Sequence, residues 1–252
     1  MKRFITSNPF LYTVGLILVF VLWLLISFSL GQGNLVFPSP FQVFGETGRL
    51  LGDSFTYKSI GLSLLRTLEG FGISLAGALI LGSLAGEIKP LQKVLKPLMI
   101  VLKSAPTAAF VFLFILLSGS SIAPIYIVTL LAFPILYESV VAGFNAVDEQ
   151  LINAARLDGT PKWKRAIRIE LPLALPFLIL GMVNSFALSF KTEIMAEIIS
   201  GDTNPGIGSY IRMFRNGDPS DLTPIFALAL IAITIILLFD LASYIVKRKL
   251  SK

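Results

Sequence analysis

The most constraining feature of this sequence is a series of long segments that contain no charged residue. Five of them hold 17 to 34 residues each, at positions 10–30, 70–86, 104–137, 171–190 and 222–239. The hydrocarbon core of a bilayer is about 30 Å thick, and a helix of about 20 apolar residues crosses it. The segments therefore predict an all-α protein that passes through a membrane several times.

The composition supports this class and removes several others. Only 14% of the residues are charged and 55% are hydrophobic, whereas about 25% are charged in an ordinary soluble domain. The chain contains no cysteine and no histidine, which excludes disulfide scaffolds, Cys/His zinc sites and catalysis by thiols or imidazoles. An intramembrane enzyme is therefore disfavoured.

Six crossings account for the apolar segments. The 34-residue segment is too long for one crossing, and the Ser-Gly-Ser-Ser cluster at 118–121 predicts a turn within it. We expect a polytopic membrane protein with a single transmembrane domain over 1–252 and a cytoplasmic segment at 147–170. The expected spans are 10–30, 60–86, 97–117, 122–146, 171–197 and 222–246.

The basic residues predict the orientation of these spans. If the N-terminus is cytoplasmic, 14 of the 21 Lys and Arg residues lie in cytoplasmic segments and four lie outside. Cytoplasmic loops are enriched in Lys and Arg, so we expect both termini in the cytoplasm. The net charge of +6 is then a topology signal and not a mark of nucleic-acid binding. The first apolar run is longer than the apolar region of a signal peptide, about 7–15 residues, so we expect an uncleaved span.

The segment 147–170 is long enough to form its own structure. Asp148 is expected to cap a first helix, and Gly159 to end it in a left-handed turn. Thr160 followed by Pro161 predicts the start of a second helix, because a proline at the first helical position loses no hydrogen bond.

Two interpretations of this segment remain open. Its basic residues and Trp163 suit an amphipathic stretch that lies among lipid headgroups. The small Ala154-Ala155 pair and the fixed turn at Gly159 favour close docking onto a cytoplasmic protein.

Motifs in this segment and elsewhere recur together in one known family. They are Asn153-Ala154-Ala155, Gly159, Ile169 and Leu171-Pro172 in the loop, and Val36-Phe37-Pro38-Ser39-Pro40, Lys103-Ser104-Ala105-Pro106, Val147-Asp148, Ala196-Glu197 and Gly206-Ile207-Gly208 outside it. In order and register they resemble the nitrate/sulfonate/taurine branch of binding-protein-dependent ABC importer permeases. The chain departs from the family at Asn153, where Glu is usual, so a contact that needs a carboxylate there is in doubt.

The resemblance implies a type I ABC importer permease (MetI-like) fold in which the 147–170 segment holds a cytoplasmic coupling helix. It implies a bacterial inner membrane location and membrane lipid around the spans. Its implied partners are a second copy of the permease, separate ATPase subunits and an extracytoplasmic solute-binding protein. The implied solutes are nitrate, sulfonates, taurine or vitamin-related pyrimidines. The residues implied in ATPase docking are Asn153, Ala154, Ala155, Leu157, Gly159, Lys162, Trp163, Lys164 and Arg165.

No cofactor, metal or catalytic residue is expected in this chain. A P-loop holds nucleotide phosphates with a Gly-Lys sequence, and none of the 20 glycines here is followed by lysine. ATP and Mg²⁺ are therefore expected on the partner ATPase.

Charged residues within the spans are candidates for a solute path or gate, because an ionised side chain at the bilayer centre costs about 2.5–3.5 kcal/mol. Arg66 and Glu69 lie one helical turn apart and are expected to neutralise each other. The candidate path or gate residues are Arg66, Glu69, Lys103, Lys191, Glu193 and Glu197. In the alternative function, an ion-coupled secondary transporter or channel, the coupling would fall to Glu69, Glu138, Glu193 and Glu197.

The second expected span also carries a packing signal. Ser74, Ala78, Gly82 and Gly86 recur at four-residue spacing, and small residues at this spacing let membrane helices approach closely. The pattern predicts a helix contact, either within the subunit or across a dimer.

Overall fold

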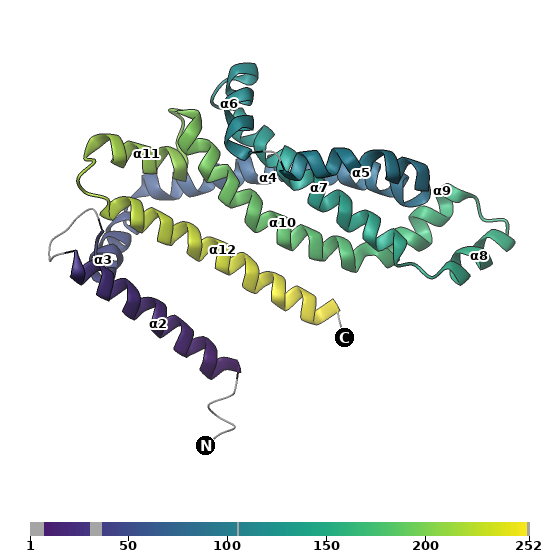
Figure 1. Ribbon diagram of the computed structural model, residues 1–252, viewed down its shortest axis with the longest axis horizontal. Helices are drawn as coiled ribbons and strands as arrows, with labels where there is room; N and C mark the ends of the chain where they lie inside the picture. Colours follow the sequence, from purple (N-terminus) through teal and green to yellow (C-terminus); the bar gives the residue numbers. More distant parts are fainter. Residues whose placement is uncertain (1–7, 31–36, 105, 251–252) are drawn as a thin grey trace. The chain divides into compact units, whose positions relative to one another are not determined.

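A computed structural model of the chain describes residues 8–30, 37–104 and 106–250, which form helices and connecting loops without strands (Figure 1). The helices in chain order are α2 (Asn8–Ser29), α3 (Pro40–Leu51), α4 (Ser54–Glu87), α5 (Lys89–Ser104), α6 (Thr107–Ser118), α7 (Ala123–Asn145), α8 (Glu149–Leu157), α9 (Lys162–Arg165), the π-helical η1 (Ala166–Glu170), α10 (Leu171–Ser200), α11 (Ile207–Gly217) and α12 (Thr223–Leu250). The prediction of an all-α protein is confirmed.

Several helices match the expected spans. Among the described residues, four helical stretches are long and apolar enough to cross a membrane, namely 54–87, 123–145, 162–200 and 223–241. The pair α5 and α6 makes a fifth if it counts as one broken span. The described apolar part of α2, Thr13–Ser29, is shorter than these. A multi-pass membrane protein is thus confirmed, and six crossings remain a prediction.

The third expected span, 97–117, is not one straight helix. Helices α5 and α6 meet at an angle of 95°, and Pro106 is the N-cap of α6. Proline has no backbone N–H to donate and disfavours helical geometry in the residue before it. The helix therefore breaks within the Lys103–Pro106 motif, of which Ala105 lies outside the described residues.

The contacts divide the chain into two compact units, and the single domain over 1–252 remains a prediction. The first unit contains residues up to 57 together with 210–233. Within it, Trp23 of α2 donates from Nε1 to the carbonyl oxygen of Pro38 at 3.1 Å, and Ser39 forms a capping box with Gln42 at the start of α3. The Pro-rich motif at 37–40 thus ties the end of α2 to α3, while Val36 lies outside the described residues.

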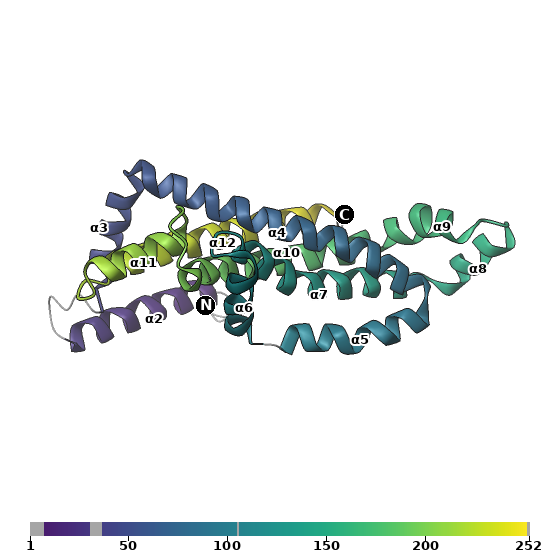
Figure 2. The same cartoon turned by 90° about the horizontal axis from the view of Figure 1, so that it is seen from above.

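The second unit contains 58–209 and the chain from 234 onward, and within it α4 packs closely against α7 (Figure 2). A Cβ added to Gly82 would lie 2.8 Å from the Cβ of Val140, and one added to Gly86 would lie 2.6 Å from the Cβ of Phe144. Ser74 donates from Oγ to the carbonyl oxygen of Thr129 at 2.5 Å. The predicted small-residue contact is therefore confirmed, and it lies within the subunit.

Helix α10 also packs against α7. Val140 and Phe144 of α7 form a buried cluster with Ala174 and Leu178 of α10. Since lipid offers no hydrophobic drive for helix association, close van der Waals packing of this kind holds membrane helices together. Helix α7 is consequently the central element of the second unit.

The fifth span begins earlier than the expected position 171. Helices α9, η1 and α10 form one continuous helical stretch over 162–200. The backbone N–H of Leu171 donates to the carbonyl oxygen of Ala166, five residues back, and Pro172 follows. Because Pro172 cannot donate to the residue four positions before it, a π-helical turn accommodates the proline without ending the helix. The second half of the 147–170 segment is thus continuous with the helix of the fifth span, and the cytoplasmic location of 147–170 remains a prediction.

Candidate functional site

The most extensive buried polar site in the second unit surrounds Arg66 of α4. The Arg66 guanidinium donates to Glu197 Oε1 at 2.5 Å and to Asp202 Oδ2 at 3.0 Å. The side chains of Glu197 and Asp202 are 0% and 2% exposed. Buried charges persist in a protein when they are paired and hydrogen-bonded. We call Ser63, Arg66, Ser121, Glu193, Glu197, Asp202 and Asn204 the Arg66 cluster.

The Glu197 carboxylate is held from several directions. Its Oε2 atom accepts from Ser63 Oγ at 2.9 Å and from the backbone N–H of Gly208 at 2.8 Å. A Cβ added to Gly206 would lie 2.0 Å from Glu197 Oε1, and one added to Gly208 would lie 2.6 Å from Glu197 Cβ. The Gly-Ile-Gly motif at 206–208 is therefore explained by close approach of its backbone to this carboxylate.

Asp202 extends the Arg66 cluster to the start of α7. Its Oδ1 atom accepts from Ser121 Oγ at 3.0 Å and from the backbone N–H of Asn204 at 3.1 Å. The Asn204 side chain donates in turn to Ser121 Oγ at 3.1 Å. The loop at 201–206 is thereby tied to α4, to α10 and to the turn before α7.

Glu193 lies one helical turn before Glu197 and behaves differently. Its side chain is fully buried, and neither carboxylate oxygen has a hydrogen-bond partner within the described part of the chain. An unpaired carboxylate in such a place is costly as an anion. Glu193 is therefore the least satisfied member of the Arg66 cluster.

The six candidate path or gate residues do not form one group. The structure brings Arg66, Glu193 and Glu197 together, whereas Glu69 and Lys191 are exposed on their helices. The expected pairing of Arg66 with Glu69 is wrong, because the Arg66 guanidinium points to α10 and the following loop. Lys103 forms a half-exposed ion pair with Glu138 at 2.6 Å.

A second candidate site is the segment 147–170, which contains α8. Asp148 caps α8 by accepting from the N–H of Gln150, and Gly159 has a φ of +71°, so both predictions for this helix are confirmed. The second helix has Pro161 and not Thr160 as its N-cap, a shift of one residue that is common at helix ends. Figures 1 and 2 both place α8 at one end of the second unit, beyond α7 and α10.

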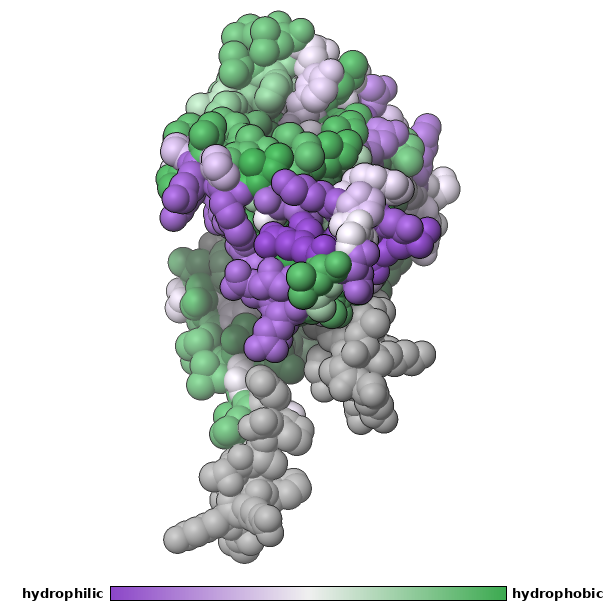
Figure 3. All heavy atoms as spheres, turned by 90° about the vertical axis from the view of Figure 1, so that its right-hand side faces the viewer, coloured by the Kyte–Doolittle hydropathy of each residue, from purple (hydrophilic) through white to green (hydrophobic). Residues whose placement is uncertain are grey.

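Most of the predicted docking residues are accessible. Leu157 is 90% exposed and Trp163 is 68% exposed. Hydrophilic side chains gather on the face seen in Figure 3, which looks onto the end of the second unit that carries α8. The other exposed members are Asn153, Ala154, Gly159 and Lys162, while Lys164 is half-buried and Ala155 is buried. A leucine that projects fully into solvent leaves apolar surface that a second protein can bury.

Arg165 was expected among the docking residues, but the structure buries it. Its side chain is 3% exposed and donates to Glu170 at 2.6 Å and to Glu87 at 2.8 Å. The guanidinium thus joins the start of the fifth span to the end of α4, where it is unavailable to a partner. We call Glu87, Arg165 and Glu170 the Arg165 cluster.

Several residues of these sites escaped prediction from sequence. Ser63 lies three positions before Arg66, a spacing that places both on one helix face, so it could have been found. Asp202 stands in a polar loop that carries no distinguishing pattern. Glu170 pairs with Arg165, five residues before it. Residues five apart lie on different faces of an α-helix, whereas the π-helical turn brings them onto one face.

Comparisons with known proteins agree with this architecture. Residues 78–252 match the family described as "Binding-protein-dependent transport system inner membrane component". The riboflavin transport system permease protein RibX of Chloroflexus aurantiacus is 29% identical over 239 residues, which cover 93% of this chain and 88% of RibX. The nitrate import permease protein NrtB of Synechococcus elongatus is 27% identical over 217 residues, 81% of this chain and 76% of NrtB.

The fold resembles that of a solved transporter. A chain of the methionine ABC transporter MetNI in an inward-facing conformation superposes with a TM-score of 0.69, at 16% identity, over 79% of this chain and 97% of that one. At this identity the likeness concerns the fold alone.

Proposed function

The chain belongs to the family of binding-protein-dependent transport system inner membrane components, and from this premise we propose that it forms the translocation path of an ATP-driven importer for a small solute. The solute is delivered by an extracytoplasmic binding protein, and ATP with Mg²⁺ is bound and hydrolysed on separate ATPase subunits. Two copies of the chain form the working permease in the bacterial inner membrane, surrounded by lipid and with both termini in the cytoplasm.

Helix α8 is the proposed docking element for the ATPase. The observation that carries this assignment is the exposure of Leu157, 90%, at the end of a capped helix that projects beyond the membrane-spanning helices. An apolar anchor that enters a groove supplies much of the affinity of a helix-in-groove contact. The positive-inside distribution of Lys and Arg supports a cytoplasmic location for this end of the chain.

The Arg165 cluster is the proposed connection between α8 and the spans. Helix α8 leads through the Gly159 turn into the continuous helix 162–200, and Arg165 binds this helix to α4 through Glu87 at 2.8 Å. A displacement of α8 by the ATPase is thus passed to two spans at once. A buried guanidinium that bonds two carboxylates is suited to this role because its planar geometry is rigid.

The Arg66 cluster is proposed to lie toward the opposite side, next to the solute path. Its hydrogen bonds fix the loop at 201–206 between α4, α7 and α10. The proposed solute class covers nitrate, sulfonates and taurine, or a vitamin-related pyrimidine. The similarity to permeases named for riboflavin and nitrate supports solutes of this kind.

Reconstitution tests the energy source. Vesicles that contain this chain alone are expected to take up neither nitrate nor taurine when a proton or sodium gradient is imposed. Vesicles that contain the chain with its co-purifying ATPase and binding protein should accumulate solute only when ATP is supplied. Uptake driven by an ion gradient in the absence of ATPase would support the secondary transporter instead.

A variant of the α8 anchor tests the docking assignment. Leu157→Asp should reduce ATPase co-purification by about tenfold, the effect of about 1.4 kcal/mol. The control is Leu51→Asp, which changes an exposed leucine at the end of α3 and should leave co-purification unchanged. Equal co-purification of the two variants would favour the interpretation in which the segment lies among lipid headgroups.

A further inference from the structure

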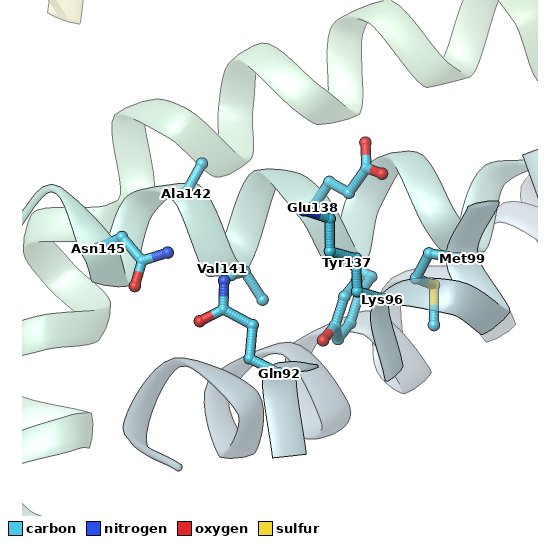
Figure 4. Close-up of a pocket in the computed structure, with 8 residues that line it drawn as sticks. All are labelled: Gln92, Lys96, Met99, Tyr137, Glu138, Val141, Ala142 and Asn145. Carbon is cyan, nitrogen blue, oxygen red and sulfur yellow. The ribbon is translucent and has the colours of Figure 1, made fainter. Parts of the chain in front are cut away.

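A pocket opens between α5 and α7 in the second unit, and it shares no residue with the two clusters described above. Its volume is about 290 Å³, and its walls are formed by Gln92, Lys96, Met99, Tyr137, Glu138, Val141, Ala142 and Asn145 (Figure 4). Ligand sites usually combine apolar walls with a few convergent polar groups. This pocket has that combination, with Met99 and Val141 buried behind the polar side chains.

The hydroxyl of Tyr137 points to a missing ligand. The side chain is 3% exposed, and its oxygen has no hydrogen-bond partner within the described part of the chain. Buried polar atoms are almost always hydrogen-bonded, so an orphaned one calls for an explanation. In Figure 4 the ring extends from α7 toward α5, and the Gln92 amide extends from α5 toward α7.

The pocket offers hydrogen-bond donors to an anion, and its one carboxylate is already paired. Lys103 already pairs with the Glu138 carboxylate at 2.6 Å, and Lys89 donates to the side-chain oxygen of Asn145. Figure 4 shows the amide nitrogen of Asn145 turned to the pocket side. Lys96 forms no ion pair with any described residue. The pocket wall therefore offers an ammonium, amide N–H groups and a hydroxyl as donors, beside the Glu138 carboxylate, whose charge Lys103 offsets.

We infer that this pocket binds the oxyanion group of a small organic anion, a carboxylate or a sulfonate, with Lys96 and Tyr137 as the principal donors and Met99 and Val141 against its apolar part. The inference rests on the proposed function, because it takes the anion to be the transported solute, bound at a site along the translocation path. The volume of about 290 Å³ admits a molecule smaller than most drug-sized ligands.

The test uses trifluoromethanesulfonate as a fluorine-labelled probe and follows its ¹⁹F line width against the full chain in phosphatidylcholine nanodiscs. Wild-type protein should broaden the line saturably. Lys96→Gln should weaken binding by about tenfold or more, as loss of a charge-assisted hydrogen bond predicts, and Tyr137→Phe by about three- to tenfold. The control, Lys93→Gln, changes an exposed lysine of α5 outside the pocket and should bind as wild type does. Equal affinity of all four proteins overturns the inference.

Two further measurements keep the result unambiguous. Tyr137→Phe removes an orphaned hydroxyl, so its unfolding temperature without probe should equal or exceed that of the wild type, which separates lost binding from lost folding. Nanodiscs containing phosphatidylglycerol distinguish the source of the oxyanion. If that lipid abolishes probe binding, the pocket holds a headgroup and the solute assignment is overturned. Probe binding needs no ATPase, so the two proposals can fail separately. If the probe does not bind but ATP-driven transport succeeds, only the pocket assignment fails. If the probe binds but no ATP-driven transport occurs, the proposed function fails and the binding of an anion in the pocket stands.

Discussion

The guanidinium of Arg66 lies 2.5 Å from the carboxylate of Glu197, although 131 positions separate the two residues in the chain. This ion pair joins α4 to α10, and Asp202 adds the following loop. Charges within membrane spans are rare and usually pair with one another or face water. Here the Arg66 side chain is only 10% exposed, and its guanidinium pairs with two carboxylates.

Removal of Arg66 should destabilise the protein. Arg66→Leu leaves two buried carboxylates without their cation, and breaking a buried pair in this way costs about 3–5 kcal/mol. Thermal unfolding in nanodiscs measures the loss. Glu69→Gln is the control, because Glu69 is exposed on the same helix and such changes stay within about 0.5 kcal/mol. Similar unfolding temperatures for the two variants would contradict the role given to Arg66.

The two buried glutamates of α10 should respond in opposite ways to the same substitution. Glu197→Gln weakens a charge-assisted pair with Arg66 and should cost about 1.5–3 kcal/mol. Glu193→Gln replaces a carboxylate whose oxygens are unpartnered among the described residues, so stability should be unchanged or raised. Chemical or thermal unfolding of both variants gives the comparison, and a larger loss for Glu193→Gln would refute it.

Gly206 should not tolerate a side chain. In Gly206→Ala the new Cβ would lie 2.0 Å from Glu197 Oε1, so the carboxylate must move away from Arg66. Overpacking of this kind costs about 1–3 kcal/mol. Gly61→Ala is the matched control, since a Cβ there meets no atom within 4 Å and alanine favours helix by about 0.5–1 kcal/mol. Unfolding temperatures should therefore move in opposite directions.

The turn after α8 should require a left-handed conformation. Gly159 has a φ of +71°, which a β-branched residue adopts only with strain. Gly159→Val should reduce ATP-driven transport by about tenfold, the effect of about 1.4 kcal/mol, with normal membrane insertion. Gly159→Asn should retain most of the activity because asparagine accepts this conformation. Transport assays in vesicles with the ATPase present would decide, and equal rates for Val and Asn would remove the argument for the turn.

Charge reversal should have different effects at Arg165 and at Lys162, three positions before it. Arg165→Glu would place three carboxylates together at a 3% exposed position, so the protein should fail to accumulate in the membrane. Lys162→Glu changes an exposed side chain and should leave accumulation normal while ATPase co-purification falls severalfold. Normal accumulation of the Arg165 variant would show that the Arg165 cluster does not hold the fold together.

The elements that were predicted well depend on local physics. Length and hydropathy identify the helices around 60–86, 122–146 and 222–246, because a membrane-spanning helix satisfies its own backbone hydrogen bonds. The Asp148 cap and the Gly159 turn are likewise local, since each involves residues within a few positions of one another. Small residues at four-residue spacing in α4 indicate a helix contact for the same reason.

The sequence by itself determined the class of protein, the helical segments, the capped α8 and the family of the chain. Only the tertiary structure decided that Arg66 binds Glu197 and Asp202 instead of Glu69, that Arg165 is buried against Glu87, and that the small-residue face of α4 meets α7. The physical reason is that a charged side chain within a span pairs with whichever opposite charge the packing brings near. Helical periodicity places residues on faces, whereas the choice of partner depends on how the faces of distant helices meet.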